Sequence, residues 1–233
     1  MRKLGTVLGI LILATGLASA TTVTMQLTGF AGPNGGPNTS DGVYTYPYYF
    51  SITVGSTTST NVALVCDSYD NEVWQNETWT ANQISLTDII AGTANGLYGP
   101  ASLYEDAAWL FAQMGTHPND ATAAEYNWAI WGLFSSNAKT QSGYVSSGAA
   151  NAIASLPSSF NGFDFSGYSV YVPASPSNAK LNGNPVSNTP QEYIGYSHSS
   201  QSHNPPPQTP EPASMVLLAS GLTGLAVKLR LKR

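Results

Sequence analysis

The sequence predicts an α+β fold: a β-rich exported domain with two or three buried helices, an N-terminal signal peptide and a single C-terminal transmembrane helix. Alternating apolar side chains in the first third indicate strands, and a change to helical spacing in the middle indicates helices. Apolar segments next to basic residues at both ends indicate targeting. We expect a signal peptide over 1–20, the domain over 21–197, a Ser/Pro-rich linker over 198–209, and a sorting and anchor segment over 210–233.

The N-terminal segment has the three parts of a secretory signal peptide. Arg2 and Lys3 precede an apolar stretch over 4–17, and Ala18 and Ala20 give the small-x-small pattern of a cleavage site. We therefore expect signal peptidase to act here and the mature chain to begin near Thr21.

Five segments are predicted to be strands. Residues 22–30 alternate apolar and polar side chains, and 43–54 and 60–66 are rich in Tyr, Val and Ile. Pro47, inside the second of these runs, indicates an edge strand or a bulge. Further strand-like runs at 168–172 and 191–196 flank a polar segment, 173–190, that we expect to be a loop.

The middle of the chain has helical periodicity. Residues 101–114 place apolar side chains at helical spacing, and 120–138 are apolar on nearly every side, which is typical of a buried helix. A weaker third helix is predicted over 142–156. Asn127 lies on an apolar stripe of the second helix, where a side-chain amide needs hydrogen-bond partners.

The charge distribution argues against nucleic acid as a partner. Six of the eight Lys and Arg residues lie in the terminal segments, so residues 21–209 hold Lys139 and Lys180 against twelve acids, a formal charge of −10. Phosphate neutralisation requires basic groups that this region lacks. The many Gly, Ser, Thr, Asn and Tyr residues are typical of a secreted, β-rich surface protein.

The C-terminal segment is predicted to be a short membrane anchor. An apolar stretch over 213–227 would span about 22 Å as a helix, against a hydrocarbon core of about 30 Å. The basic residues that follow predict that this end stays in the cytoplasm, with the domain on the other side of the inner membrane. They are Lys228, Arg230, Lys232 and Arg233.

Pro210, Glu211 and Pro212, followed by this apolar stretch and basic cluster, resemble the PEP-CTERM sorting signal of Gram-negative bacteria. The resemblance implies recognition by exosortase, cleavage near the motif, and release to the cell surface or the extracellular polysaccharide matrix. Tails of this kind have also been given an ice-binding label. Ice recognition requires regularly repeated Thr-rich faces, and residues 55–61 form only one polar turn.

The single cysteine, Cys66, ends an apolar run, which favours burial beside Asn127; a reactive thiol or an intermolecular disulfide are the alternatives. Cys66 and Asp67, with the helix at 123–131, resemble the thioester domains of bacterial surface adhesins. In that family the cysteine attacks a glutamine amide, and the product captures amines. Here Asn127 stands at the glutamine position and Tyr126 where threonine is usual, so the resemblance argues for a shared fold more than for shared chemistry.

Other chemistry has weaker support in the sequence. Asp67, Asp70 and Glu72 do not have the spacing of an EF-hand, and the histidine positions give no metal-binding motif, so we predict no metal and no cofactor. A hydrolase acting on exopolysaccharide would need two carboxyl groups about 5 to 10 Å apart in a cleft. The favoured hypothesis is a non-enzymatic adhesive or matrix-binding protein, which contacts extracellular polysaccharide through Tyr- and Asn-rich surface. The alternative is a covalent adhesin that uses a linkage between Cys66 and Asn127.

Overall fold

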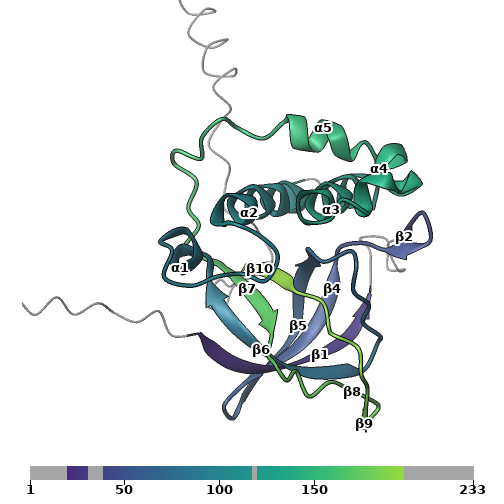
Figure 1. Ribbon diagram of the computed structural model, residues 1–233, viewed down its shortest axis with the longest axis vertical. Coiled ribbons are helices and arrows are strands. Elements are labelled where there is room, and N and C mark those ends of the chain that lie inside the picture. The colour runs from purple at the N-terminus through teal and green to yellow at the C-terminus, as the bar shows by residue number, and fades with distance from the viewer. Residues whose placement is uncertain (1–19, 31–38, 117–119, 197–233) are drawn as a thin grey trace, which may run out of the picture.

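The computed structural model describes residues 20–30, 39–116 and 120–196 (Figure 1). They form a β-rich domain in which an antiparallel barrel is covered on one side by helices, so the coarse α+β prediction is confirmed. Among the described helices, none has the length and apolar character needed to cross a bilayer. Apart from Ala20, the predicted signal peptide lies outside the described residues, as do the linker from residue 198, the sorting motif and the C-terminal anchor.

The barrel closes because the first strand pairs with strands on both of its sides. All of its pairings are antiparallel, and buried side chains alternate with more exposed ones along β1, β4 and most of β6. The order around the barrel is β1 (Thr21–Phe30), β4 (Tyr48–Val54), β5 (Thr57–Cys66), β10 (Tyr193–Tyr196), β7 (Tyr168–Pro173) and β6 (Glu77–Ser85), which returns to β1.

Two short hairpins accompany the barrel, the first as a separate two-stranded sheet and the second as an extension of the barrel sheet. One consists of β2 (Thr39–Ser40) and β3 (Val43–Tyr44), and the other of β8 (Lys180–Leu181) and β9 (Asn184–Pro185), with β8 paired to β6. The second hairpin lies in the segment that we expected to be a loop. The predicted strand over 43–54 is divided into β3 and β4, and Pro47 lies between them rather than inside a strand.

The barrel interior is filled by aromatic side chains from different strands. The ring centroid of Phe50 lies 4.7 Å from that of Tyr193 and 5.8 Å from that of Trp79. These side chains have 0 to 1% of their surface exposed. Edge-to-face contacts of this kind add to the free energy gained by burying the rings.

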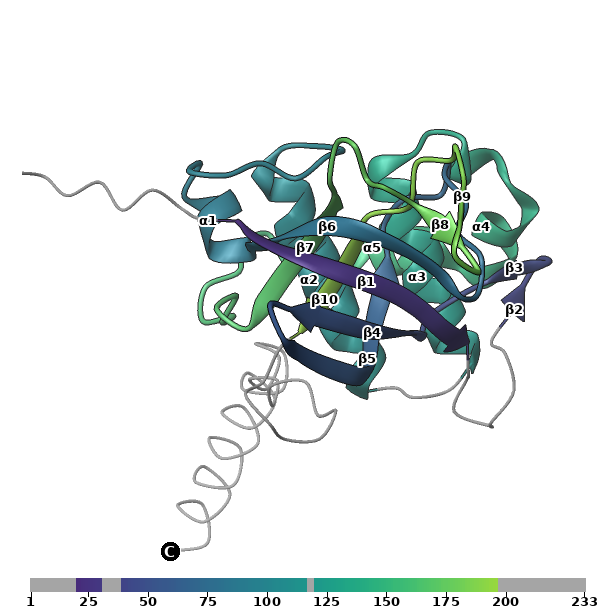
Figure 2. The same ribbon diagram turned by 90° about the horizontal axis from the view of Figure 1, so that it is seen from below.

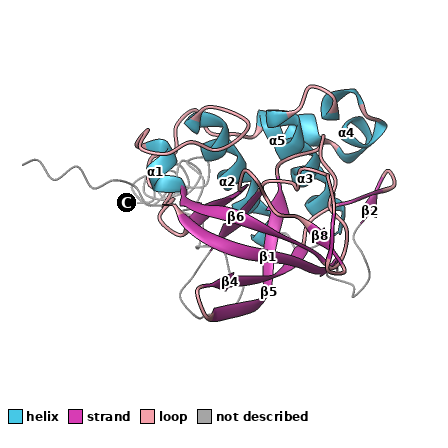
Figure 3. Ribbon diagram, turned by 60° about the horizontal axis from the view of Figure 1, so that its bottom comes forward, coloured by secondary structure: helices cyan, strands magenta, loops and turns pink. Residues whose placement is uncertain are grey.

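The helices form two layers above the barrel, α2 and α3 against the strands and α4 and α5 outside them (Figures 1 and 3). The apolar surface of the second predicted helix is explained by this position, because α3 contacts α2, β5, α4 and α5. The third predicted helix is two short helices, separated by Gly148 in the left-handed conformation. The helices are α1 (Leu86–Ile90), α2 (Ala101–Thr116), α3 (Asp120–Phe134), the 3-10 turn η1 (Ala138–Thr140), α4 (Ser142–Ser147) and α5 (Ala149–Ala154).

Candidate functional site

Cys66 ends strand β5 where the barrel meets the helix pair. Its side chain is fully buried and forms no disulfide. The thiol donates a hydrogen bond to the backbone oxygen of Ser68, over 3.3 Å. The predicted burial of this cysteine beside Asn127 is confirmed.

Asn127, on α3, is also fully buried and uses both ends of its amide. Its Oδ1 accepts a hydrogen bond from the backbone N–H of Tyr46 over 2.7 Å, and its Nδ2 donates to the backbone oxygen of Cys66 over 3.2 Å. The amide therefore ties the helix to the end of β5 and to the segment before β4. This meets the requirement that a buried amide be hydrogen-bonded.

The surroundings of the thiol disfavour its ionisation. Burial raises the pKa of the Cys66 thiol far above its ordinary value, and the neighbouring Asp67 carboxyl raises it further. The Trp131 side chain and the backbone at Ser68 lower the pKa by smaller amounts. Because the thiolate is the nucleophile, a thiol held neutral in this way is poorly reactive.

A pair of buried carboxyl groups lies next to the thiol. Asp67 follows Cys66 directly, and Glu192 comes just before β10; both side chains are 0% exposed. Among the described residues no donor bonds to either oxygen of the Asp67 carboxyl, and the neighbouring side chain that acts on its pKa is the Glu192 carboxyl. Two adjacent carboxyl groups can hydrogen-bond to each other only when a proton lies between them.

Two hydrogen bonds fix Glu192 in place, and a third holds one of the donors. The Tyr104 hydroxyl, from α2, donates to Oε1 over 2.6 Å, and the backbone N–H of Leu97 donates to Oε2 over 2.9 Å. The Tyr104 oxygen in turn accepts a hydrogen bond from the backbone N–H of Tyr98 over 3.0 Å. Glu192 therefore connects the barrel to α2 and to the loop that precedes it.

The pair is neutralised by a proton rather than by a basic side chain. In the described ranges the Lys and Arg residues are Lys139 and Lys180, and both are exposed. Burial raises the pKa of Asp67 and of Glu192, and the charge of Glu192 raises that of Asp67 further. The hydrogen bonds from Asp67, Tyr104 and Leu97 oppose the rise at Glu192. A protonated Asp67 that donates to a Glu192 carboxylate explains why Glu192 raises the pKa of Asp67 and why Asp67 lowers that of Glu192.

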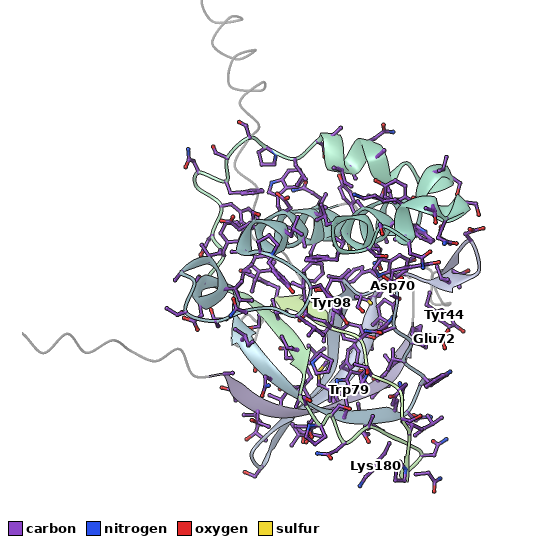
Figure 4. All side chains as sticks on the ribbon, viewed as in Figure 1. Tyr44, Asp70, Glu72, Trp79, Tyr98 and Lys180 are labelled. Atoms are coloured by element: carbon purple, nitrogen blue, oxygen red, sulfur yellow. The ribbon has the colours of Figure 1, made fainter. Side chains whose placement is uncertain are left out.

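Cys66, Asp67, Tyr104, Asn127 and Glu192 together are called the junction cluster below. Ser68 and Tyr98 lie on its outer side, where the Ser68 hydroxyl donates to the Tyr98 oxygen over 3.0 Å. Tyr98 is half-buried, and Figure 4 places it between the helix pair and the barrel. The cluster is therefore close to the surface but covered by side chains.

The other acids considered for metal binding do not join this cluster. Asp70 and Glu72 are exposed, and Asp70 accepts a hydrogen bond from the Asn137 amide over 2.9 Å. Among the described residues no group of three or more His, Cys, Asp or Glu side chains is placed to hold a metal ion. Ala20 is exposed just before β1; Ala18, Pro210, Glu211 and Pro212 lie outside the described residues, as does the terminal basic cluster.

The sequence reasoning missed Glu192, which it placed in a strand-like run without a role. A glutamate between Gln191 and the apolar Tyr193 and Ile194 is a signal in retrospect, because burial of its neighbours requires a partner for the carboxylate. The chain matches no protein-family model, and no curated protein or solved structure is significantly similar to it.

Proposed function

We propose that this protein is a non-enzymatic binding protein of the surface or extracellular matrix of a Gram-negative bacterium. The segment 1–20 directs export, exosortase processes the segment 210–233 after a transient stay in the inner membrane, and the domain over 21–197 binds matrix polysaccharide. The two terminal segments, with the Pro210-Glu211-Pro212 motif, support the route.

The observation that carries the non-enzymatic binding role is that the candidate reactive side chains, Cys66 and Asn127, form hydrogen bonds to backbone groups. The Cys66 thiol donates to the backbone at Ser68, and the Asn127 amide is held by two backbone groups. Both residues thus support the junction between barrel and helices. Exposed aromatic side chains such as Tyr44 and Trp74, each with more than 40% of its surface exposed, suit stacking against sugar rings.

Hydrolysis of polysaccharide has less support from the geometry. Glycosidase carboxyl groups stand about 5 Å or more apart, which leaves room for the substrate between them. Asp67 and Glu192 instead lie close enough to shift each other's pKa, and both are fully buried. This arrangement suits a structural pair.

The test is reversible retention of the purified mature chain, beginning at Thr21, on matrix polysaccharide from a Gram-negative host. We expect retention without a covalent adduct, and elution by the free polysaccharide. Lack of retention on any matrix fraction would contradict the proposal, and so would retention that resists denaturant.

One observation favours the covalent alternative. The Tyr46 N–H that donates to Oδ1 of Asn127 would stabilise the oxyanion formed when a nucleophile attacks that amide. In such a reaction the Cys66 sulfur bonds to Cγ of Asn127, the C–N bond breaks, and the thiol proton leaves with the nitrogen as ammonia. An amine then displaces the sulfur and restores the thiol.

Intact mass spectrometry separates the two functions. A thioester lowers the mass of the native chain by one ammonia, methylamine converts it to an adduct, and Cys66 resists iodoacetamide until then. The binding function instead predicts an unchanged mass and alkylation of Cys66 only after denaturation, because the thiol is buried.

A further inference from the structure

The outer surface of β6, β1, β4 and β5 carries a row of threonines that runs across the strands. Thr24 of β1 pairs with Thr80 of β6 on one side and with Thr53 of β4 on the other, and Thr53 pairs with Thr58 of β5. Directly paired residues in antiparallel strands lie on the same face. Because Val23 and Met25 point into the core, Thr24 points outward, and so does the whole row.

A second row runs parallel to the first. Gln26 of β1 pairs with Thr78 of β6 and with Ser51 of β4. Neighbouring strands are about 4.8 Å apart, so each row offers a hydroxyl or amide at this interval. The two rows, Thr80, Thr24, Thr53 and Thr58 with Thr78, Gln26 and Ser51, are called the hydroxyl face.

The helices do not cover the hydroxyl face. They pack on the opposite side of the barrel, and Figure 2 shows β6, β1 and β4 across the front of the molecule. Thr24 and Thr58 are exposed, and the remaining members are partly exposed. The face is therefore available to a ligand, as far as the described residues extend.

The chemistry of the face indicates which ligand it fits. Its members are uncharged and offer both donors and acceptors, and Lys180 lies at its margin, paired with Thr78. The domain as a whole carries an excess of acids, so an anionic polymer would be repelled. A neutral polymer of hydroxyl groups has the matching charge and hydrogen-bonding capacity.

An aromatic side chain continues the same surface. Tyr49, two residues before Ser51 on β4, is half-buried and pairs with Gly29 of β1 and Ala63 of β5. Neither neighbour is large enough to cover a tyrosine ring, and a Cβ atom at Gly29 would meet no heavy atom within 4 Å. A ring beside a row of hydroxyls is suited to stack on one sugar while the hydroxyls bond to the next.

We propose that the hydroxyl face, with Tyr49, is the binding surface for a neutral polysaccharide chain. This proposal rests on the proposed binding function and adds the surface and the ligand class. A barrel surface is twisted and curved, which a flexible glycan can follow better than a planar ice lattice can.

The test compares matched threonine-to-valine variants of the mature chain. Thr24→Val with Thr80→Val removes two adjacent hydroxyls of the face while keeping side-chain shape and β propensity. Thr87→Val with Thr140→Val makes the same change at two exposed positions outside the face. Tyr49→Ala tests the stacking contact, and Gln26→Ala is a second face variant should the double variant fold poorly.

Binding is measured by affinity gel electrophoresis in dextran, hydroxyethyl cellulose, galactomannan or anionic alginate, with the melting temperature of each variant as the folding control. We expect at least one neutral polysaccharide to retard the wild-type chain and alginate to leave it unaffected. The affinity of the face variants should be lower than that of the wild type by about tenfold or more. The control variant should bind like the wild type.

Each other result has a distinct meaning. Equal retardation of wild type and face variants would overturn the surface assignment and leave the binding function standing. Retardation by alginate alone would overturn the ligand class. Absence of retardation in every polysaccharide, matrix fractions included, would contradict both the binding function and the surface assignment. If the wild-type chain shaped ice crystals and the face variants did not, the ligand of the face would be ice and not a glycan.

Discussion

The junction cluster and the hydroxyl face place similar polar side chains in opposite surroundings. In the cluster, water is excluded, and Asn127 and Glu192 bond to backbone N–H or C=O groups from other segments of the chain. On the face, Thr24 and Thr58 are exposed to solvent. A buried polar group stabilises one arrangement of the chain because leaving it unpaired is costly. An exposed one contributes little to folding and remains available to a ligand.

Removal of the buried amide should give the largest loss of stability. Asn127→Ala leaves the Tyr46 N–H and the Cys66 carbonyl without their partner, and each unpaired group costs about 1 to 3 kcal/mol. We expect the free energy of unfolding to decrease by about 2 to 5 kcal/mol, measured by urea denaturation.

Asn82 provides the matched control. It lies on β6 opposite Thr22, is partly exposed, and water can replace its contacts. Asn82→Ala should change stability by no more than about 0.5 kcal/mol. Similar losses for the two variants would contradict the distinction between buried and exposed polar side chains.

The carboxyl pair should make stability fall as pH rises. The pKa values of Asp67 and Glu192 are raised in the folded domain, whereas in an unfolded chain these groups titrate near pH 4. Above pH 4 the native state therefore holds protons that the unfolded state has released, and stability decreases with increasing pH. The stability that the protonated pair contributes is fully present below about pH 4, and it is lost as pH rises through the raised pKa values of the two groups. The loss is about 1.4 kcal/mol per pH unit for each proton that only the folded chain retains.

Asp67→Asn isolates this effect. An asparagine can still donate to the Glu192 carboxylate but does not titrate. Between pH 5 and pH 8 the variant should therefore lose less stability than the wild type, in urea titrations at each pH. This range lies below the ordinary pKa values of cysteine and tyrosine. Equal slopes for both proteins would show that the pair holds no shared proton.

Tyr104→Phe should have a smaller effect. It removes the hydroxyl that donates to Glu192 and accepts from the Tyr98 N–H, at an expected cost of about 1.5 kcal/mol at pH 5. Tyr44→Phe makes the same change on an exposed ring and should be neutral. A neutral Tyr104→Phe would mean that water takes over both contacts.

The sequence predicted the strands and helices whose apolar residues repeat regularly. β1 and α3 are examples, because Val23, Met25 and Leu27 are buried on one face and α3 is enclosed by other elements. β6 was missed because Glu77 occupies an inward position that the pattern assigns to an apolar residue. In the fold Asn188 and the backbone N–H of Trp74 donate to that carboxylate, and these contacts come from outside the strand.

The residues of the candidate site could likewise be predicted only where they lie in a regular apolar run. Cys66 and Asn127 could be paired because each lies in an apolar run, whereas Glu192 meets Asp67 only through the pairing of β10 with β5. The sequence shows one polar turn at 55–61. The first row of the hydroxyl face takes single threonines from four strands in register, so no repeat along the chain indicates it.

The smallest expected change in stability is for a variant of the hydroxyl face. Thr24→Val replaces an exposed hydroxyl by a methyl group of the same shape on a central strand, so stability should change by no more than about 0.5 kcal/mol in either direction. Urea denaturation and glycan binding are measured on the same preparation. Unchanged unfolding with weaker binding assigns the Thr24 hydroxyl to the ligand. A loss of stability above about 1 kcal/mol would instead make it part of the fold, because a hydroxyl that only meets water has no partner to lose.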